Sequence, residues 1–276
     1  MITEKKQDPQ DIHYQICGKG DKTVILVHGL LSSLREWDRM SQKLVSGGYR
    51  TIALDLPGHG ESLKPAEVDF YSADSFYKYF KEWIDHLNLA APPVLIGHSF
   101  GGNLCLRYTL DHQQDLGGLV LMSPFLAYDQ VPGLVRFVLA SPRIAAGSLK
   151  NAPFGLIKFI LWAGNLIRRN SRLTSFLSKS ELHQMAIDFK KCSPNIAYLS
   201  GTVGDITVRL VEVKLPALLI WGKHDHILSA SWYLQGALKI PHATRKVLNA
   251  GHNPHLSNIS EVYPILVDFL EANFAR

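Results

Sequence analysis

The chain has 276 residues, of which 46% are hydrophobic and 19% charged, and its formal net charge is +5. This apolar content is ample to bury the core of a single domain. The first ten residues are polar and mixed in charge, so no secretory signal is expected. The three cysteines (Cys17, Cys105 and Cys192) are odd in number and show no metal-binding pattern, which favours a reducing, cytoplasmic compartment.

The first part of the chain alternates strand patterns with helix patterns, as a parallel sheet requires. Strands are predicted at Ile12–Ile16, Thr23–Val27 and Thr51–Leu54, and helices at Leu34–Ser46 and around Phe76–Leu87, the latter capped by Ser72 or Asp74. Thr23–Val27 is almost wholly apolar, which is typical of a strand that is covered on both faces.

The segment Gly97-His98-Ser99-Phe100-Gly101 fits the Gly-x-Ser-x-Gly pattern of a nucleophile elbow. This elbow is a strained turn between a strand and a helix that presents one serine. The context agrees, because Pro93–Ile96 reads as a buried strand and Asn103–Tyr108 begins a helical pattern. A serine hydroxyl is a poor nucleophile until a base takes its proton, so an acid and a histidine are expected further along the chain.

A strand is predicted at Leu119–Met122, and after Ser123-Pro124 the alternation stops until Leu215-Pro216. The stretch between reads as helices and turns. From Gln130 to Ser180 it contains no Asp or Glu, and it accounts for the positive charge of the chain. Its eight basic residues are Arg136, Arg143, Lys150, Lys158, Arg168, Arg169, Arg172 and Lys179.

Within this basic stretch, Phe154–Ile167 is nearly all apolar but too short to span a bilayer, which needs about 20 residues. Two interpretations stay open. The helices could pack on the main domain with a solvated basic face, or they could form a lid that rests weakly against an anionic membrane surface. Nucleic-acid binding is not expected, because stacking aromatics do not accompany the basic residues.

Two further strands are predicted in the last part of the chain, each followed by a candidate partner for Ser99. Asp225 follows Ala217–Gly222, and His252 follows Thr244–Leu248. Open parallel sheets place their sites just past the carboxyl ends of strands. The chain order serine, acid, histidine is also the order expected after this kind of elbow.

Five motifs in this order resemble the α/β-hydrolase superfamily, in its branch with a helical cap, over nearly the whole chain. They are His28-Gly29-Leu30, Asp55-Leu56-Pro57-Gly58-His59-Gly60-Glu61-Ser62, Gly97 to Gly101, Trp221-Gly222-Lys223-His224-Asp225 and Gly251-His252. The resemblance implies an α/β fold with a mostly parallel central sheet, flanked by helices, and a helical cap inserted after the sixth strand. We expect the core at residues 1–124 and 214–276 and the cap at residues 125–213.

The resemblance also implies a role for individual residues. Ser99 would be the nucleophile, His252 the general base and acid, and Asp225 the carboxylate that orients His252. The backbone N–H groups of Leu30 and Phe100 would form the oxyanion hole for the negative oxygen of the tetrahedral intermediate. No cofactor and no metal ion is expected.

Two residues compete with the predicted acid and base. His255 lies three residues beyond His252, although the position directly after Gly251 favours His252. Asp129 follows the strand at Leu119–Met122, a position that some members of the family use for the acid.

The remaining histidines near these motifs are expected to have structural roles. His28 and His59 would shape loops, and His98 would pack beside the nucleophile. His224 and His226 flank the predicted acid, but the carboxylate or thiolate cluster that a metal site needs does not accompany them.

The nucleophile restricts the chemistry. Dehalogenases and epoxide hydrolases of this fold carry Asp where Ser99 stands, because their alkyl-ester intermediate requires a carboxylate. Ser99 instead indicates acyl transfer through an acyl-enzyme that water cleaves. We expect an esterase- or lipase-like serine hydrolase of a hydrophobic carboxylic ester. Thioesters, carbon–carbon bonds beside a carbonyl and cofactor-free haloperoxidation remain alternatives, as does a small-molecule receptor that retains the triad.

Overall fold

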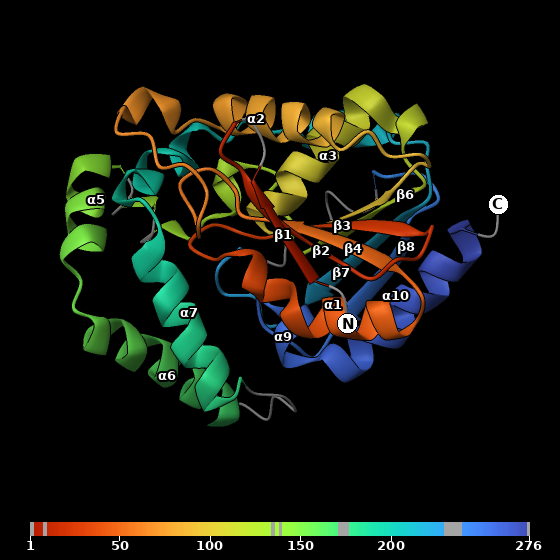
Figure 1. The fold of residues 1–276 in the computed structure, drawn as a ribbon. Coiled ribbons are helices and arrows are strands. Elements are labelled where there is room, and N and C mark those ends of the chain that lie inside the picture. Colours follow the sequence, from red (N-terminus) through yellow and green to blue (C-terminus); the bar gives the residue numbers. More distant parts are fainter. Residues whose placement is uncertain are drawn as a thin grey trace.

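The computed structural model describes residues 3–7, 10–133, 136–137, 140–170, 177–228 and 239–274. These residues form one eight-stranded sheet in the order β1-β2-β4-β3-β5-β6-β7-β8 (Figure 1). The strands are β1 (Thr3–Gln7), β2 (His13–Cys17), β3 (Thr23–Val27), β4 (Arg50–Leu54), β5 (Val94–His98), β6 (Gly118–Met122), β7 (Ala217–Gly222) and β8 (Thr244–Leu248). β2 is antiparallel to both of its neighbours and the other pairs are parallel, so the predicted, mostly parallel sheet is confirmed.

The edge strand β1 has no counterpart among the strands predicted from the sequence. Its residues, Thr3-Glu4-Lys5-Lys6-Gln7, are all polar, so they carry no hydrophobic alternation. β1 pairs with β2 from Thr3↔Cys17 to Gln7↔His13. Charged side chains are common on edge strands, where they discourage pairing with another chain. With β1 counted, β6 is the sixth strand.

Helices cover both faces of the sheet (Figure 1). The helices α2 (Ala73–His86) and α3 (Phe100–His112) pack on one face, and α1 (Asp38–Ser46) and α10 (Ile259–Phe274) on the other. The predicted helix over residues 34–46 is a 3₁₀ helix, η1 (Leu34–Trp37), followed by α1. Ser72 caps α2, since its hydroxyl accepts a hydrogen bond from the Ser75 N–H. β3, β5, β6 and β7 are buried along their whole length, which explains their continuous apolar sequences.

Short helices complete the described part of the core. They are η2 (Val68–Phe70), η3 (Gln113–Asp115) and α9 (Pro254–Ser257). The three cysteines are buried and form no disulfide.

The segment between β6 and β7 contains helices, and its described residues form no strand. Its elements are η4 (Tyr128–Gln130), α5 (Pro142–Asn151), α6 (Phe154–Asn170), α7 (Lys179–Lys191), η5 (Pro194–Tyr198), η6 (Ser200–Thr202) and η7 (Thr207–Glu212). α5, α6 and α7 stand to one side of the sheet (Figure 1). Phe125 and Leu210, near the two ends of the segment, belong to the same apolar cluster as α2 and α3. None of the described helices is long and apolar enough to cross a membrane.

Candidate active site

Ser99 stands in a strained turn between β5 and α3. β5 ends at His98, α3 begins at Phe100, and Ser99 has φ +51° and ψ −119°. A positive φ is costly for a residue with a side chain, and such strain is concentrated at functional sites. A Cβ atom on Gly97 would lie 2.5 Å from the carbonyl oxygen of Gly101, so the turn requires glycine at this position.

Asp225 and His252 meet in the loops that follow β7 and β8. His252 Nδ1 lies 2.8 Å from Asp225 Oδ2. Asp225 Oδ1 accepts hydrogen bonds of 2.9 Å from the N–H groups of Ile227 and Leu228, which fix the carboxylate. Burial alone would raise the pKa of Asp225, but the His252 imidazole and these N–H groups lower it.

The protonation state of His252 follows from the same surroundings. Burial lowers the pKa of His252 below its ordinary value, although Asp225 opposes this shift. The ring is therefore neutral at pH 7, with its proton on Nδ1 directed at Asp225 and an electron pair on Nε2. Ser99, Asp225 and His252 are only 6% to 9% exposed, so charges that form there are poorly screened by water.

The loop of His252 also meets the turn that carries Ser99. His98 Nε2 lies 3.0 Å from the main-chain oxygen of His252, and the two rings have their centroids 4.8 Å apart. The structure therefore brings the three predicted residues to the same edge of the sheet. His98 was expected only to pack, and this contact is more specific than packing.

The two competing residues lie elsewhere. Asp129 is exposed and pairs with Arg136. His255 is buried, and it contacts Glu36 rather than Asp225. Neither residue therefore takes part in the pair that Asp225 forms with His252.

The loop after β3 lies against the nucleophile turn. A Cβ atom on Gly29 would lie 3.0 Å from Ser99 Cβ. Across the described residues, the backbone N–H groups of Leu30 and Phe100 donate no hydrogen bond. Leu30 follows Gly29 and Phe100 follows Ser99, so these two amides without an acceptor are the candidates for stabilising an oxyanion.

Two buried histidines shape this loop. His28 Nε2 accepts a hydrogen bond from the Leu56 N–H at 3.0 Å, so its Nδ1–H donates to the Gly29 oxygen at 2.7 Å. His59 Nε2 accepts from the Leu31 N–H at 3.1 Å. Burial lowers the pKa of His59 to about 3, so its ring is neutral and can accept. These contacts agree with the expected loop-shaping roles of both histidines.

Asp55 is a structural residue to which the sequence interpretation gave no role. Its carboxylate accepts hydrogen bonds from the N–H groups of Leu34 (2.8 Å) and Glu61 (2.9 Å) and contacts His13 Nδ1 at 2.9 Å. Burial would raise the pKa of Asp55, but these partners lower it to about 2. Asp55 thereby connects β2, the start of η1 and the loop after β4. In the sequence, the signal for this role was the position of Asp55 as the first residue of the motif Asp55 to Ser62.

Glu36, His98 and His255 form the one group of potential metal ligands among the described residues, with ligand atoms within 4.8 Å of one another. Glu36 Oε1 lies 2.7 Å from His98 Nδ1 and 2.9 Å from His255 Nε2, so the three side chains are in direct contact. His224, which flanks Asp225, contacts Asn249 Oδ1 at 3.0 Å instead.

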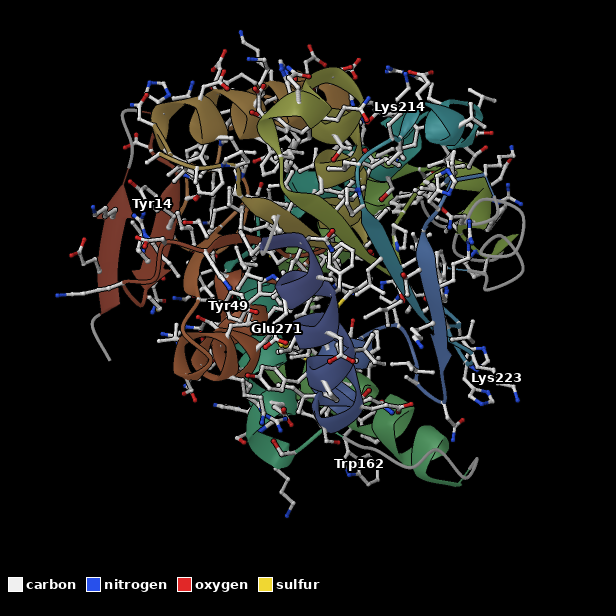
Figure 2. The ribbon with its side chains drawn as sticks, turned by 90° about the vertical axis from the view of Figure 1, so that its right-hand side faces the viewer. Tyr14, Tyr49, Trp162, Lys214, Lys223 and Glu271 are labelled. Atoms are coloured by element: carbon white, nitrogen blue, oxygen red, sulfur yellow. The ribbon has the colours of Figure 1, made fainter. Side chains whose placement is uncertain are left out.

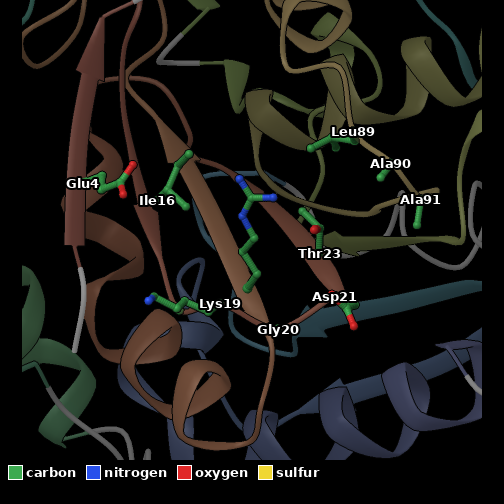
Figure 3. A pocket seen from close by; sticks show the side chains of 11 residues that line it. Glu4, Ile16, Lys19, Gly20, Asp21, Thr23, Leu89, Ala90 and Ala91 are labelled. Atoms are coloured by element: carbon green, nitrogen blue, oxygen red, sulfur yellow. The ribbon is translucent and has the colours of Figure 1, made fainter.

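A surface hollow of about 430 Å³ lies at the opposite end of the sheet (Figure 3). Its lining includes Thr23 and Arg50, the first residues of β3 and β4, together with Glu4 and Asp21. Parallel sheets of this kind place their sites at the carboxyl ends of strands, where Ser99 lies. We therefore assign this hollow no part in the chemistry.

Comparison with known proteins agrees with the geometry. Residues 22–259 match the family model described as the alpha/beta hydrolase fold. The chain is 27% identical over 282 residues to epoxide hydrolase 3 of Xenopus tropicalis, covering 95% of this chain and 76% of that protein. It is 28% identical over 233 residues to a 2-hydroxy-6-oxononadienedioate/2-hydroxy-6-oxononatrienedioate hydrolase of Escherichia coli, covering 79% and 75%. A bromoperoxidase from Bacillus anthracis has a similar fold, with a TM-score of 0.79, 21% identity and coverage of 98% and 100%.

Proposed function

The chain belongs to the alpha/beta hydrolase fold family, and from this premise we propose that it is a serine hydrolase that cleaves a hydrophobic carboxylic ester, in class EC 3.1.1. One observation carries the proposal. Ser99 occupies a strained elbow at φ +51°, while the Asp225–His252 pair, bonded at 2.8 Å, reaches the same edge of the sheet. A nucleophile, a base and an orienting acid are what acyl transfer requires.

The proposed reaction has two halves. Ser99 Oγ attacks the ester carbonyl carbon while His252 Nε2 takes the hydroxyl proton. The carbonyl oxygen becomes negative and accepts hydrogen bonds from the N–H groups of Leu30 and Phe100. The intermediate collapses, His252 returns the proton to the leaving alcohol, and an acyl-enzyme remains. A water molecule then gives a proton to His252 and attacks the acyl carbon. As the acid leaves, His252 returns this proton to Ser99 Oγ, which restores the enzyme. Asp225 holds the imidazole and stabilises its positive charge in both halves.

The identity of residue 99 separates this chain from one of its relatives. Epoxide opening in this fold needs a carboxylate nucleophile, and this chain has a serine at that position. The serine apparatus is also compatible with hydrolysis of a carbon–carbon bond beside a carbonyl, with thioester hydrolysis and with haloperoxidation. The substrate series below separates the first two of these activities from ester cleavage.

Exposed apolar side chains on the surface of α5 and α6 of the predicted cap agree with a hydrophobic substrate. The exposed side chains of α5 and α6 include Ile144 (69%), Phe159 (60%), Ile160 (60%) and Trp162 (49%). Figure 2 shows Trp162 at the periphery of the molecule. Phe159, Ile160 and Trp162 lie within four residues of one another on α6, and exposed apolar side chains this close together are unusual for a protein that acts alone in water.

We propose that this surface rests weakly against an anionic membrane. Arg143, Lys150 and Lys158 are exposed on the same two helices, and no acidic residue occurs from Gln130 to Ser180. Near anionic lipid, each such cation contributes about 1 kcal/mol of attraction, which salt weakens. The side chains of Arg168 and Arg169, and all of Arg172, lie outside the described residues.

Vesicle sedimentation tests the membrane contact. Wild type should sediment with anionic vesicles at low salt and not with neutral ones, and replacing Phe159 and Trp162 with Ser should abolish this. Arg136→Gln is the matched control, because Arg136 is already paired with Asp129. If anionic vesicles leave wild type in the supernatant, the cap surface is a solvated face.

A series of p-nitrophenyl esters tests the hydrolase. We expect sustained turnover, faster for medium-chain esters than for acetate, and none for Ser99→Ala. A single turnover without a steady state would instead identify a receptor. Thioesters and 2-hydroxy-6-oxononadienedioate, the compound named for the Escherichia coli relative, are assayed in parallel, and faster turnover of either would replace the ester assignment.

A further inference from the structure

A second, fully buried group of charged side chains lies next to the proposed catalytic loop. Glu36 on η1, His98 at the end of β5 and His255 on α9 converge from three distant parts of the chain. Glu36 Oε1 is 2.7 Å from His98 Nδ1 and 2.9 Å from His255 Nε2, and none of the three side chains is more than 4% exposed. The proposed mechanism uses none of them.

The His98 ring has a polar neighbour on each side. Nδ1 faces the Glu36 carboxylate, and Nε2 lies 3.0 Å from the main-chain oxygen of His252. The His252 oxygen can only accept a hydrogen bond, so Nε2 carries a proton. Nδ1 lies at ion-pair distance from the Glu36 carboxylate, which favours a second proton there and hence an imidazolium. The group is thus a buried ion pair.

The surroundings agree with this charge state. Burial would lower the pKa of His98, but Glu36 and the His252 carbonyl raise it. Burial would raise the pKa of Glu36, but His98 and His255 hold it well below its usual range. Burial lowers the pKa of His255 to about 4, so His255 is neutral beside Glu36, and its ring stacks on Trp37 with centroids 4.5 Å apart.

The position of His98 connects the Glu36–His98 pair to both Ser99 and His252. His98 is covalently joined to Ser99, and its hydrogen bond goes to the backbone of His252 itself. Proton transfer between Ser99 and His252 requires their heavy atoms to lie within about 3.2 Å. A bond between the immediate neighbour of the nucleophile and the backbone of the base therefore acts directly on that separation.

We propose that the Glu36–His98 ion pair, steadied by His255, positions His252 against Ser99. These are positioning residues that act through the backbone of the base, and the inference rests on the proposed function. A misplacement of about 1 Å between reacting groups costs about 10² in rate, so loss of this bond should be seen in kcat and not in KM.

Two substitutions of His98 separate its two bonds. The amide nitrogen of Asn stands near the place of Nδ1, and that of Gln near the place of Nε2. His98→Gln can therefore still donate to the His252 oxygen, whereas His98→Asn retains only the donor toward Glu36. We expect His98→Asn to react at least about tenfold more slowly than His98→Gln, because only the Gln variant retains a hydrogen bond to the backbone of His252. His86→Gln, at an exposed position on α2, is the control.

The rate of Ser99 phosphonylation, kcat, KM and Tm are measured for each variant. His252 is faced by Asp225, Glu36 and His98, and the positive charge of His98 lowers its pKa. Both His98 variants should therefore move the acid limb of kcat/KM to higher pH, which a merely structural role would not do. If neither folds, Glu36→Gln retains the shape of the pair without its charge, and its kcat should fall at least about tenfold with KM unchanged.

Three results would overturn the inference. Equal rates for the Asn and Gln variants, or an unmoved acid limb, would show that the pair does not position His252. Stoichiometric metal in the purified native protein would make the group a metal site. Wild type without any label at Ser99 is a different outcome, because it refutes the proposed function itself before the variants are compared.

Discussion

Replacing Asp225 with Asn changes one atom of the buried acid and should inactivate the enzyme. In the native protein Oδ1 accepts from the N–H groups of Ile227 and Leu228, and Oδ2 faces His252 Nδ1. The Asn oxygen must retain the two backbone bonds, so its NH₂ group points at His252. The imidazole then accepts at Nδ1 and carries its proton on Nε2, where it can no longer take a proton from Ser99.

The size of the effect follows from this tautomer. A matching substitution in a serine protease lowers kcat about 10⁴-fold, which corresponds to about 5 kcal/mol of transition-state stabilisation. Asp225 is only 6% exposed, so water cannot substitute for the lost carboxylate. We expect a loss of at least about 10³ in kcat, because the strained serine and the two amides remain.

The assay is hydrolysis of a soluble p-nitrophenyl ester, with Tm measured to confirm folding. Asp129→Asn is the matched control, since Asp129 is exposed and pairs with Arg136, and its kcat should be unchanged. A kcat for Asp225→Asn within about tenfold of wild type would refute the assignment. A large loss at Asp129 instead would transfer the role to that residue.

Two further predictions concern pH. First, kcat/KM should rise with pH along a limb whose midpoint lies below 6.5, because only neutral His252 accepts a proton and burial lowers its pKa; a midpoint above 6.5 would contradict this. Second, the pKa of Asp55 is about 2 in the folded protein against an ordinary 3.8, so its charge stabilises the fold above pH 3.8 and loses this effect as pH falls toward 2. Asp55→Asn should therefore lower the free energy of unfolding, measured in urea at neutral pH, by about 2 kcal/mol, and this difference from wild type should shrink in acid. A difference that stays constant with pH would show that the charge of Asp55 does not stabilise the fold.

The parts of the site that follow from local constraints could be predicted from the sequence. The turn at Ser99 is defined by glycine at 97, where any Cβ would meet the Gly101 carbonyl, so five consecutive residues contain the signal. Asp225 and His252 each follow a buried apolar strand, and the order of parallel strands brings their ends together.

Features that depend on tertiary contacts could not be predicted from the sequence. β1 is polar and is held by backbone pairing with β2, so no hydrophobic pattern marks it. Glu36 belongs to none of the five motifs, and its partners His98 and His255 are distant in the chain. The apolar character of α6 predicted a helix, but which of its side chains stay exposed depends on how α7 packs against it.

The most direct test of the central claim is the mass of the protein after reaction with a fluorophosphonate. Wild type should gain one phosphonyl group, which peptide mapping places on Ser99, and Ser99→Ala should gain none while it retains its folded circular dichroism spectrum. A phosphonyl group on any other residue, or an equal gain in Ser99→Ala, would contradict the assignment of Ser99 as the nucleophile.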